Sequence, residues 1–325
     1  IWGCGNNTVG QLGNKTYDNQ LSLIPIINLN KPNDIFSLPY VCTGYNFSIF
    51  FKNDASGTIY GSGSNYWGAL GLGETNQVNS LSLIPIPDNK IPINVGCGCD
   101  WTIIYMSDGT LYGTGRNANC QLGVGYLSDK ITTLTNIHIS MIPNNVKILQ
   151  ISGGILHTAL LCDDNSIYVC GSNFSGQLGL GYIGDNILNF TLMPNNTGKI
   201  PIQVKCGLYH TLVLMTDGTV YSTGFESAGD GINHDSTSLY QMTSLPYGMK
   251  AKNIYTGVNS WSSIIMIDDS FNSLYGLSLN DNDKMSFGYN NTFNPTFTKI
   301  QAPINLLSKQ ICTGSSHTII LSNDQ

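Results

Sequence analysis

The sequence predicts an all-β fold, a β-propeller of about six four-stranded blades. Three observations predict it. A block that starts with an aromatic strand occurs six times along the 325 residues. A second block, Gly-x-x-His-Thr or a variant of it, precedes the aromatic strand in each unit. No segment shows the 3.6-residue spacing of apolar side chains that an amphipathic helix requires. Short strands repeating at this period without helices are typical of a propeller.

The aromatic block is clearest in residues 1–13, where an aromatic strand with spaced glycines leads into Gly-Gln-Leu-Gly. The glycines of this motif stand at Gly10 and Gly13 and return at Gly68, Gly71, Gly176 and Gly179. The copies after Phe225 are degraded. The aromatic anchors are spaced by 52 to 58 residues, the length of a propeller blade, and they are Trp2, Tyr60, Tyr112, Tyr168, Tyr221 and Tyr275.

The second block is followed by an apolar strand, a turn such as Asp108-Gly109-Thr110, and then the aromatic strand. Asp-Gly between two β-forming runs predicts a tight hairpin, because glycine adopts a positive φ without steric cost. Three copies of the block carry a histidine: His157, His210 and His317. The other three carry an aromatic ring near that position: Phe47, Trp101 and Trp261.

A third element of each unit ends in proline. The stretch 21–26 recurs letter for letter at 81–86. Proline cannot donate a hydrogen bond to a neighbouring strand, so Pro25, Pro85 and Pro194 are predicted at outer, edge strands. A fourth run, such as 202–206, leads back into the Gly-x-x-His block and completes four strands per unit.

The two ends of the sequence are in phase with each other. Residues 322–325 resemble the start of a hairpin turn, and residues 1–2 resemble the strand that follows one. We therefore expect the terminal strands to pair and close the ring, with residues 1–325 as one domain. The alternative is a seven-bladed ring with one blade outside this segment.

These motifs resemble the regulator of chromosome condensation repeat family along essentially the whole chain. The resemblance implies a propeller, usually of seven blades, that acts by binding proteins. The founding member is an exchange factor for a Ran-type GTPase on chromatin and carries a basic tail. A plant ultraviolet-B receptor of the family uses clustered tryptophans with arginines. The acidic balance and the single arginine, Arg116, argue against both of these roles here.

Charged residues make up only 10% of the chain, against about 25% in typical soluble domains. The formal charge is −6 and no basic run occurs, which argues against direct nucleic-acid binding. No apolar stretch is long enough to predict a membrane span. Long charged side chains oppose contact between copies of a protein. A surface poor in Lys, Arg and Glu therefore favours self-association more than an ordinary surface does.

Nine cysteines, an odd number, fit neither zinc-binding pairs nor a disulfide framework. We interpret them as small buried thiols, which favours a reducing, intracellular location over secretion and leaves a virion open. The sequence starts at Ile1 rather than Met, so targeting stays open.

Three patterns suggest chemistry, and each has a structural explanation. Residues 61–63 resemble a phosphate-binding loop, yet the same glycines recur in every unit and no helix follows. The acid pairs at 163–164 and 268–269 fall in turns, where aspartate caps its own backbone. His157, His210 and His317 share a position that carries Phe or Trp elsewhere, which favours packing over a metal site. We expect no catalytic site, cofactor or metal.

Trp67 and Arg116 are the candidate partner contacts, because they fall in the variable loop after the aromatic strand and these residue types are enriched in interfaces. The sequence favours a non-enzymatic scaffold that binds a protein partner or copies of itself. One alternative is a self-assembling shell component, as in a virion or genome package. Another is a nucleotide exchange factor for a small GTPase, which rests on the family resemblance.

Overall fold

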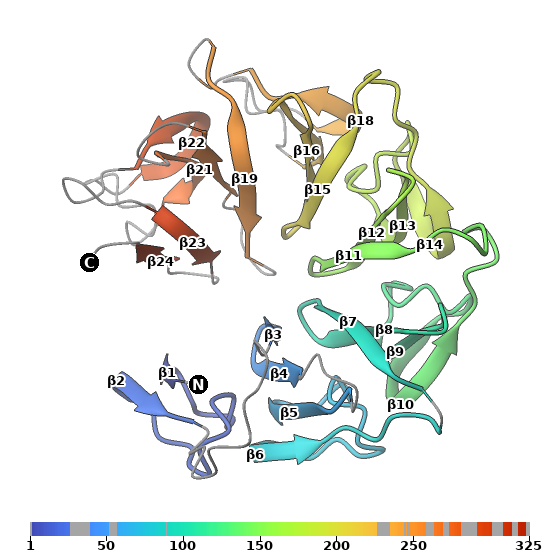
Figure 1. The fold of residues 1–325 in the computed structure, drawn as a ribbon, viewed down its shortest axis with the longest axis vertical. Coiled ribbons are helices and arrows are strands. Elements are labelled where there is room, and N and C mark those ends of the chain that lie inside the picture. The colour runs from blue at the N-terminus through green and yellow to red at the C-terminus, as the bar shows by residue number, and fades with distance from the viewer. Residues whose placement is uncertain are drawn as a thin grey trace. The chain divides into compact units, whose positions relative to one another are not determined.

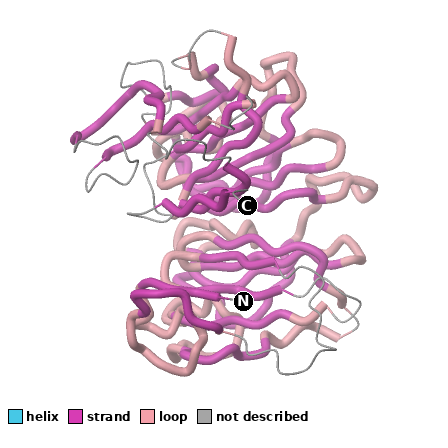
Figure 2. The backbone as a smooth tube through the Cα atoms, turned by 60° about the vertical axis from the view of Figure 1, so that its left-hand side comes forward, coloured by secondary structure: helices cyan, strands magenta, loops and turns pink. Residues whose placement is uncertain are grey.

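The computed structural model describes residues 2–26, 40–51, 57–88, 90–225, 235–243, 245, 248–257, 263–268, 273–280, 291–300, 308–313 and 318–322. Strands joined by turns and loops make up this part of the chain, and no helix occurs in it (Figure 2). The chain forms two compact units, Ile1–Asn145 and Val146–Gln325, which we call unit 1 and unit 2 and describe separately.

Unit 1 contains one two-stranded and two four-stranded antiparallel sheets (Figure 1). In the two-stranded sheet, β1 (Trp2–Gly5) pairs with β2 (Gln20–Pro25). Each four-stranded sheet runs in chain order. The first holds β3 (Tyr40–Thr43), β4 (Phe47–Phe51), β5 (Ile59–Gly63) and β6 (Val78–Leu83), and the second β7 (Pro92–Cys97), β8 (Trp101–Met106), β9 (Leu111–Asn117) and β10 (Ser128–Ile137).

Unit 2 contains three four-stranded antiparallel sheets of the same order and one two-stranded sheet. The first holds β11 (Ile148–Gly153), β12 (His157–Cys162), β13 (Ile167–Asn173) and β14 (Gly184–Leu192). The second holds β15 (Pro201–Cys206), β16 (His210–Met215), β17 (Val220–Gly224) and β18 (Ser236–Gln241). The third holds β19 (Ala251–Thr256), β20 (Ser263–Ile267), β21 (Leu274–Asn280) and β22 (Asn291–Lys299), and β23 (Ser308–Thr313) pairs with β24 (Thr318–Ser322).

The all-β propeller architecture is therefore confirmed, with one blade for each four-stranded sheet. The described residues contain five such blades, and each is an antiparallel meander of four strands in chain order. The sixth blade, its closure by the terminal strands, the seven-bladed alternative and the single domain over 1–325 stay predictions.

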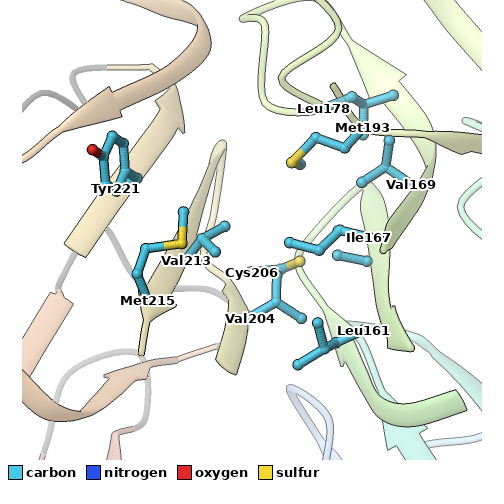
Figure 3. Close-up of a cluster of buried hydrophobic side chains, with 11 residues drawn as sticks. Leu161, Ile167, Val169, Leu178, Met193, Val204, Cys206, Val213, Met215 and Tyr221 are labelled. Carbon is cyan, nitrogen blue, oxygen red and sulfur yellow. The ribbon is translucent and has the colours of Figure 1, made fainter. Parts of the chain in front are cut away.

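The hydrophobic core lies between consecutive blades of the same unit. The second strands are apolar, and in β8, β12 and β16 every residue is buried. In unit 2, Leu161 and Val169 of one blade pack with Val213 and Met215 of the next (Figure 3). A similar cluster in unit 1 joins β4 and β5 to β8. Neighbouring sheets thus stabilise each other by burying one another's apolar faces.

Turns and strand ends follow from local chemistry. In the β8–β9 hairpin, Gly109 has φ +85°, and Asp108 Oδ1 accepts a hydrogen bond from the Thr110 backbone N–H at 3.1 Å. Asp164 makes the same contact with Ser166 N–H at 3.0 Å in the β12–β13 hairpin. Pro25 ends β2, and Pro85 and Pro194 lie just beyond β6 and β14, the fourth strands of their blades. Proline therefore stands where a blade presents its outer edge.

Candidate partner-binding site

The Gly-x-x-His block is a compact packing unit. The Gly154 backbone N–H donates to the His157 carbonyl at 2.9 Å, so the chain turns back on itself there. A Cβ built on Gly154 would lie 2.6 Å from His157 Cε1, which leaves no room for any side chain but hydrogen. Gly98 with Trp101 and Gly207 with His210 repeat this arrangement. The block therefore requires a glycine and, three residues later, a ring side chain that packs against it; histidine is one of the rings that fit.

His157 is fully buried and held in one tautomer. Its Nε2 lies 3.0 Å from Thr211 Oγ1. Because Thr211 Oγ1 donates its only hydrogen to the Gln177 carbonyl at 2.7 Å, it must accept from His157 Nε2–H. Burial, and then the nearby His210, lowers the pKa of His157 to about 3. Burial also lowers the pKa of His210 to about 4.

His157 and His210 are therefore neutral packing groups. Within the described part of the chain, no three His, Cys, Asp or Glu side chains gather as metal ligands would. His317 and Trp261, which share this repeat position, lie outside the described residues.

The loops that follow the aromatic strands depend on a residue that the sequence analysis missed. A buried asparagine stands three positions before the first glycine of the motif, or before Cys120 in the third copy. Its Oδ1 accepts from the backbone N–H five residues on, and its Nδ2 donates to the carbonyl nine residues on. We call these residues the clip asparagines: Asn7, Asn65, Asn117 and Asn173. Each follows the aromatic anchor of its repeat by five residues, and this constant offset is the signal that could have revealed them.

The motif glycines hold these loops against the fourth strand of the next blade. Gly10, Gly68 and Gly176 have φ between +74° and +81°. A Cβ on Gly68 would lie 2.8 Å from Thr132 Cα in β10, and one on Gly176 would lie 2.9 Å from the Ser236 carbonyl in β18. Gly13, Gly71 and Gly179 also have positive φ. The backbone N–H groups of Gly73 and Gly181 then donate to Thr132 and Thr237, at 2.8 and 2.7 Å.

These anchored loops expose apolar side chains at matching positions. We call the segments 64–77, 118–127 and 174–183 the rim loops; each joins the third strand of a blade to the fourth. One exposed position directly follows the clip asparagine, and two others come nine and ten residues after it. The residues and their exposed fractions are Tyr66 62%, Phe174 56%, Tyr126 49%, Tyr182 48%, Leu127 57% and Ile183 53%.

Trp67 and Arg116 come together in unit 1. Arg116 lies near the end of β9, and its Cζ is 4.9 Å from the centre of the Trp67 ring, in the rim loop of the preceding blade. Tyr66 meets the Trp67 ring edge-on, with centres 5.0 Å apart. Lys130 Nζ, in β10, lies 5.3 Å from the centre of the Tyr66 ring. Tyr66 and Lys130 are therefore grouped around Trp67 and Arg116, the pair that the sequence singled out.

The turn between β7 and β8 adds an acidic residue to this group. The Arg116 backbone N–H donates to the Asp100 carbonyl at 2.9 Å. Burial raises the pKa of the Asp100 carboxyl, while hydrogen bonding to Cys99 and the charge of Arg116 lower it. Burial and the Asp100 charge raise the pKa of the Cys99 thiol to about 12, so that thiol is protonated and unreactive.

The repeat motifs match known family models. Two models carry the description "Regulator of chromosome condensation (RCC1) repeat". One matches residues 108–161 and 164–214, and the other matches residues 148–177 and 202–230. The chain belongs to the regulator of chromosome condensation repeat family.

Among the family's curated proteins, the chain is 31% identical over 226 residues to the ultraviolet-B receptor UVR8 of Arabidopsis thaliana, covering 68% of this chain and 48% of that one. It is 37% identical over 125 residues to the secretion-regulating guanine nucleotide exchange factor of Bos taurus, covering 38% and 26%. The chain thus spans half or less of the length of these relatives.

Solved structures share the fold. Human WBSCR16 matches with a TM-score of 0.82 at 18% identity, over 99% of this chain and 80% of that one. Prp20p from Saccharomyces cerevisiae, in a structure whose title adds its binding to Gsp1p and histones, matches with a TM-score of 0.77 at 19% identity, over 99% and 78%. In the region described here, no helix is long and apolar enough to cross a membrane.

Proposed function

We propose that this chain is a non-enzymatic protein-binding scaffold that holds its partner through the rim loops. The observation that carries the proposal is the repetition of exposed apolar side chains at equivalent positions of successive loops. Aromatic side chains such as Tyr66, Phe174 and Tyr182 are the types that serve as anchors in protein interfaces. The reducing, intracellular location inferred from the cysteines is part of the same proposal.

The loops are also organised before any partner binds. Asn173 ties both halves of its loop together through Leu178 N–H and the Tyr182 carbonyl. The Gly181 N–H then fastens the loop to β18. Ordering a loop on binding costs free energy, and a loop held in advance avoids most of that cost. Phe174 and Tyr182 are therefore presented on a fixed backbone.

The test compares two variants as baits in affinity purification. In one, Phe174→Ser and Tyr182→Ser remove two rim-loop anchors. In the matched control, Leu192→Ser and Ile200→Ser remove apolar side chains that are 48% and 50% exposed but lie outside the rim loops. We expect proteins retained by the natural chain and by the control to be lost from the rim variant. Equal retention by both variants would contradict the proposal.

Nucleotide exchange on a small GTPase is the second candidate, and the exchange-factor relative named above favours it. Its test is the release of a fluorescent GDP analogue from a panel of small GTPases. We expect no acceleration by this chain; acceleration that survives the rim variant would favour exchange over scaffolding.

Self-assembly is the third candidate. The scarcity of Lys, Arg and Glu favours it, because long charged side chains resist burial in contacts between copies. No comparison supports the viral version of this idea. Size-exclusion chromatography with light scattering tests self-assembly directly: a monomer at high concentration contradicts it.

A further inference from the structure

Two positive charges of unit 1 face each other across a strand pair. Arg116 in β9 and Lys130 in β10 are register partners. Like charges at directly opposite positions destabilise a sheet. The salt bridges within the described residues join Lys90 to Asp108 and Lys199 to Asp217, so neither Arg116 nor Lys130 has one there. The fold thus places two cations opposite each other, and the described residues supply neither with an ion pair.

Aromatic rings hold both cations in place without neutralising them. Arg116 lies over Trp67 and Lys130 over Tyr66, and the two rings contact each other edge-on. A ring attracts a cation through its π face but leaves the N–H groups free to donate elsewhere. Arg116 Nε is buried and has no hydrogen-bond partner among the described residues.

Asp100 interacts with the Arg116 charge, which lowers the pKa of its carboxyl, without forming an ion pair with it among the described residues. Asp100 binds the Arg116 backbone through its carbonyl, at 2.9 Å. Its carboxylate makes no ion pair with the guanidinium in the described structure. The guanidinium thus stacks on Trp67. Its Nε is buried, but Arg116 as a whole is only partly buried, so a partner would approach the terminal Nη groups. An arginine stacked in this way is suited to grip a carboxylate through two parallel hydrogen bonds.

We infer that Arg116, Lys130, Trp67 and Tyr66 form a docking site for an acidic segment of a protein partner. Arg116 binds one Asp or Glu carboxylate of the segment and Lys130 a second. Tyr66, which is 62% exposed, packs against an apolar residue of the same segment. This inference rests on the proposed scaffold function and names the chemistry of the partner.

A nucleic acid fits the site less well than an acidic peptide. Binding to a phosphate backbone draws on many clustered cations, which release counterions along the strand. Here the cluster holds two cations on a chain of formal charge −6. Two carboxylates and an apolar side chain match the number and kind of groups that the site offers.

The experiment uses the full chain and a fluorescein-labelled peptide, Gly-Glu-Leu-Glu-Phe-Glu-Leu-Gly, with a control peptide in which every Glu is Gln. Binding is measured by fluorescence anisotropy at low and high salt. We expect the Glu peptide to bind at least about tenfold more tightly than the Gln peptide, and salt to weaken it, because charge-assisted hydrogen bonds dominate.

Variants locate the binding. We expect Arg116→Gln to raise Kd at least about tenfold, and Arg116→Lys to raise it about fivefold, since Lys keeps the charge but loses the planar fork. Trp67→Leu should weaken binding as well. The control is Lys147→Gln, which removes an exposed positive charge from unit 2 and should leave Kd unchanged. Circular dichroism checks that each variant folds; if Arg116→Gln does not, Arg116→Lys and Lys130→Gln decide.

Three outcomes would overturn the inference: equal affinity for the Glu and Gln peptides, no effect of any substitution at Arg116 or Lys130, or an equal loss in Lys147→Gln. Tighter binding of a single-stranded RNA that also depends on Arg116 would reassign the site to nucleic acid. The scaffold proposal fails separately. It fails if rim-variant and control baits retain the same proteins, whatever the peptide does, whereas partners lost only from the rim variant would support it even if the peptide does not bind.

Discussion

Replacing a clip asparagine should lower the free energy of unfolding far more than replacing a short polar side chain on the surface would. Asn173 is fully buried. Its Oδ1 accepts from Leu178 N–H at 3.2 Å, and its Nδ2 donates to the Tyr182 carbonyl at 2.8 Å. Asn173→Ala removes both hydrogen bonds. Because Leu178 is also fully buried, its N–H is left without a partner in the core.

The magnitude follows from these two contacts. A buried N–H without a partner costs about 1–3 kcal/mol, while the loss of the bond to the more exposed Tyr182 costs about 1 kcal/mol net, since water replaces it. We therefore expect Asn173→Ala to lower the free energy of unfolding by about 2–4 kcal/mol. Urea denaturation followed by circular dichroism measures the change.

Two further variants separate the parts. Asn189→Ala, at an exposed asparagine in β14, should change stability by less than about 0.5 kcal/mol. Asn173→Asp keeps the acceptor for Leu178 but loses the donor to Tyr182 and buries a carboxyl group, so it should become more destabilising as pH rises from 4 to 8. If Asn173→Ala behaves like Asn189→Ala, the clip is not what holds the loop, and the reasoning is refuted.

Three other predictions rest on the same structure. In urea denaturation, Gly176→Ala should lower the free energy of unfolding by about 1–2 kcal/mol more than Gly198→Ala. Both glycines have a positive φ, but only at Gly176 would a Cβ meet the next blade. Equal effects of the two substitutions would disprove that contact. His157 is neutral in the folded protein, with a pKa of about 3 against about 6.5 in the unfolded chain. The free energy of unfolding should therefore fall as pH drops below about 6.5, by about 2 kcal/mol at pH 5. His157→Phe should remove this decrease, and an unchanged pH profile of stability would contradict the assignment. Cys206 is buried, and its pKa is raised to about 12, so it should resist iodoacetamide in the native protein while the exposed Cys4 reacts. Mass spectrometry of the labelled peptides measures both reactions. Equal labelling of the two cysteines would refute the burial of Cys206.

The strands and turns of the blades could be predicted because their causes are local. An apolar run such as that of β8 can only be a buried strand when hairpin signals flank it on both sides. Gly109 reveals a tight turn through the φ that it allows. Pro85 marks an outer edge because it cannot donate. Each of these signals is contained within a few residues.

The surroundings of Arg116 could not be predicted, because they depend on long-range register. Trp67 was a candidate for its residue type and loop position, but its ring reaches Arg116 from a different blade. Lys130 stands opposite Arg116 after a shift in the β9–β10 register between Ser128 and Lys130. Such an irregularity changes which side chains face each other, and no local pattern in 128–130 announces it.

Two exceptions show what the motif glycines contribute. Cys120 stands where Gly10, Gly68 and Gly176 stand in their copies, and it adopts the left-handed region with φ +58°. Lys15 stands where the other three copies have Gly73, Gly125 and Gly181, and it has φ +69°. Glycine is therefore not required for the turn itself.

The clip asparagine, by contrast, is present in every one of these four loops, including that of Cys120. The asparagine imposes the path of the loop, and glycine is needed where the neighbouring strand leaves no space for a Cβ, as at Gly68. A weak repeat should therefore be judged by its asparagine before its glycines. By that criterion the fifth repeat differs from the first four, because Glu226 occupies the clip position in its sequence.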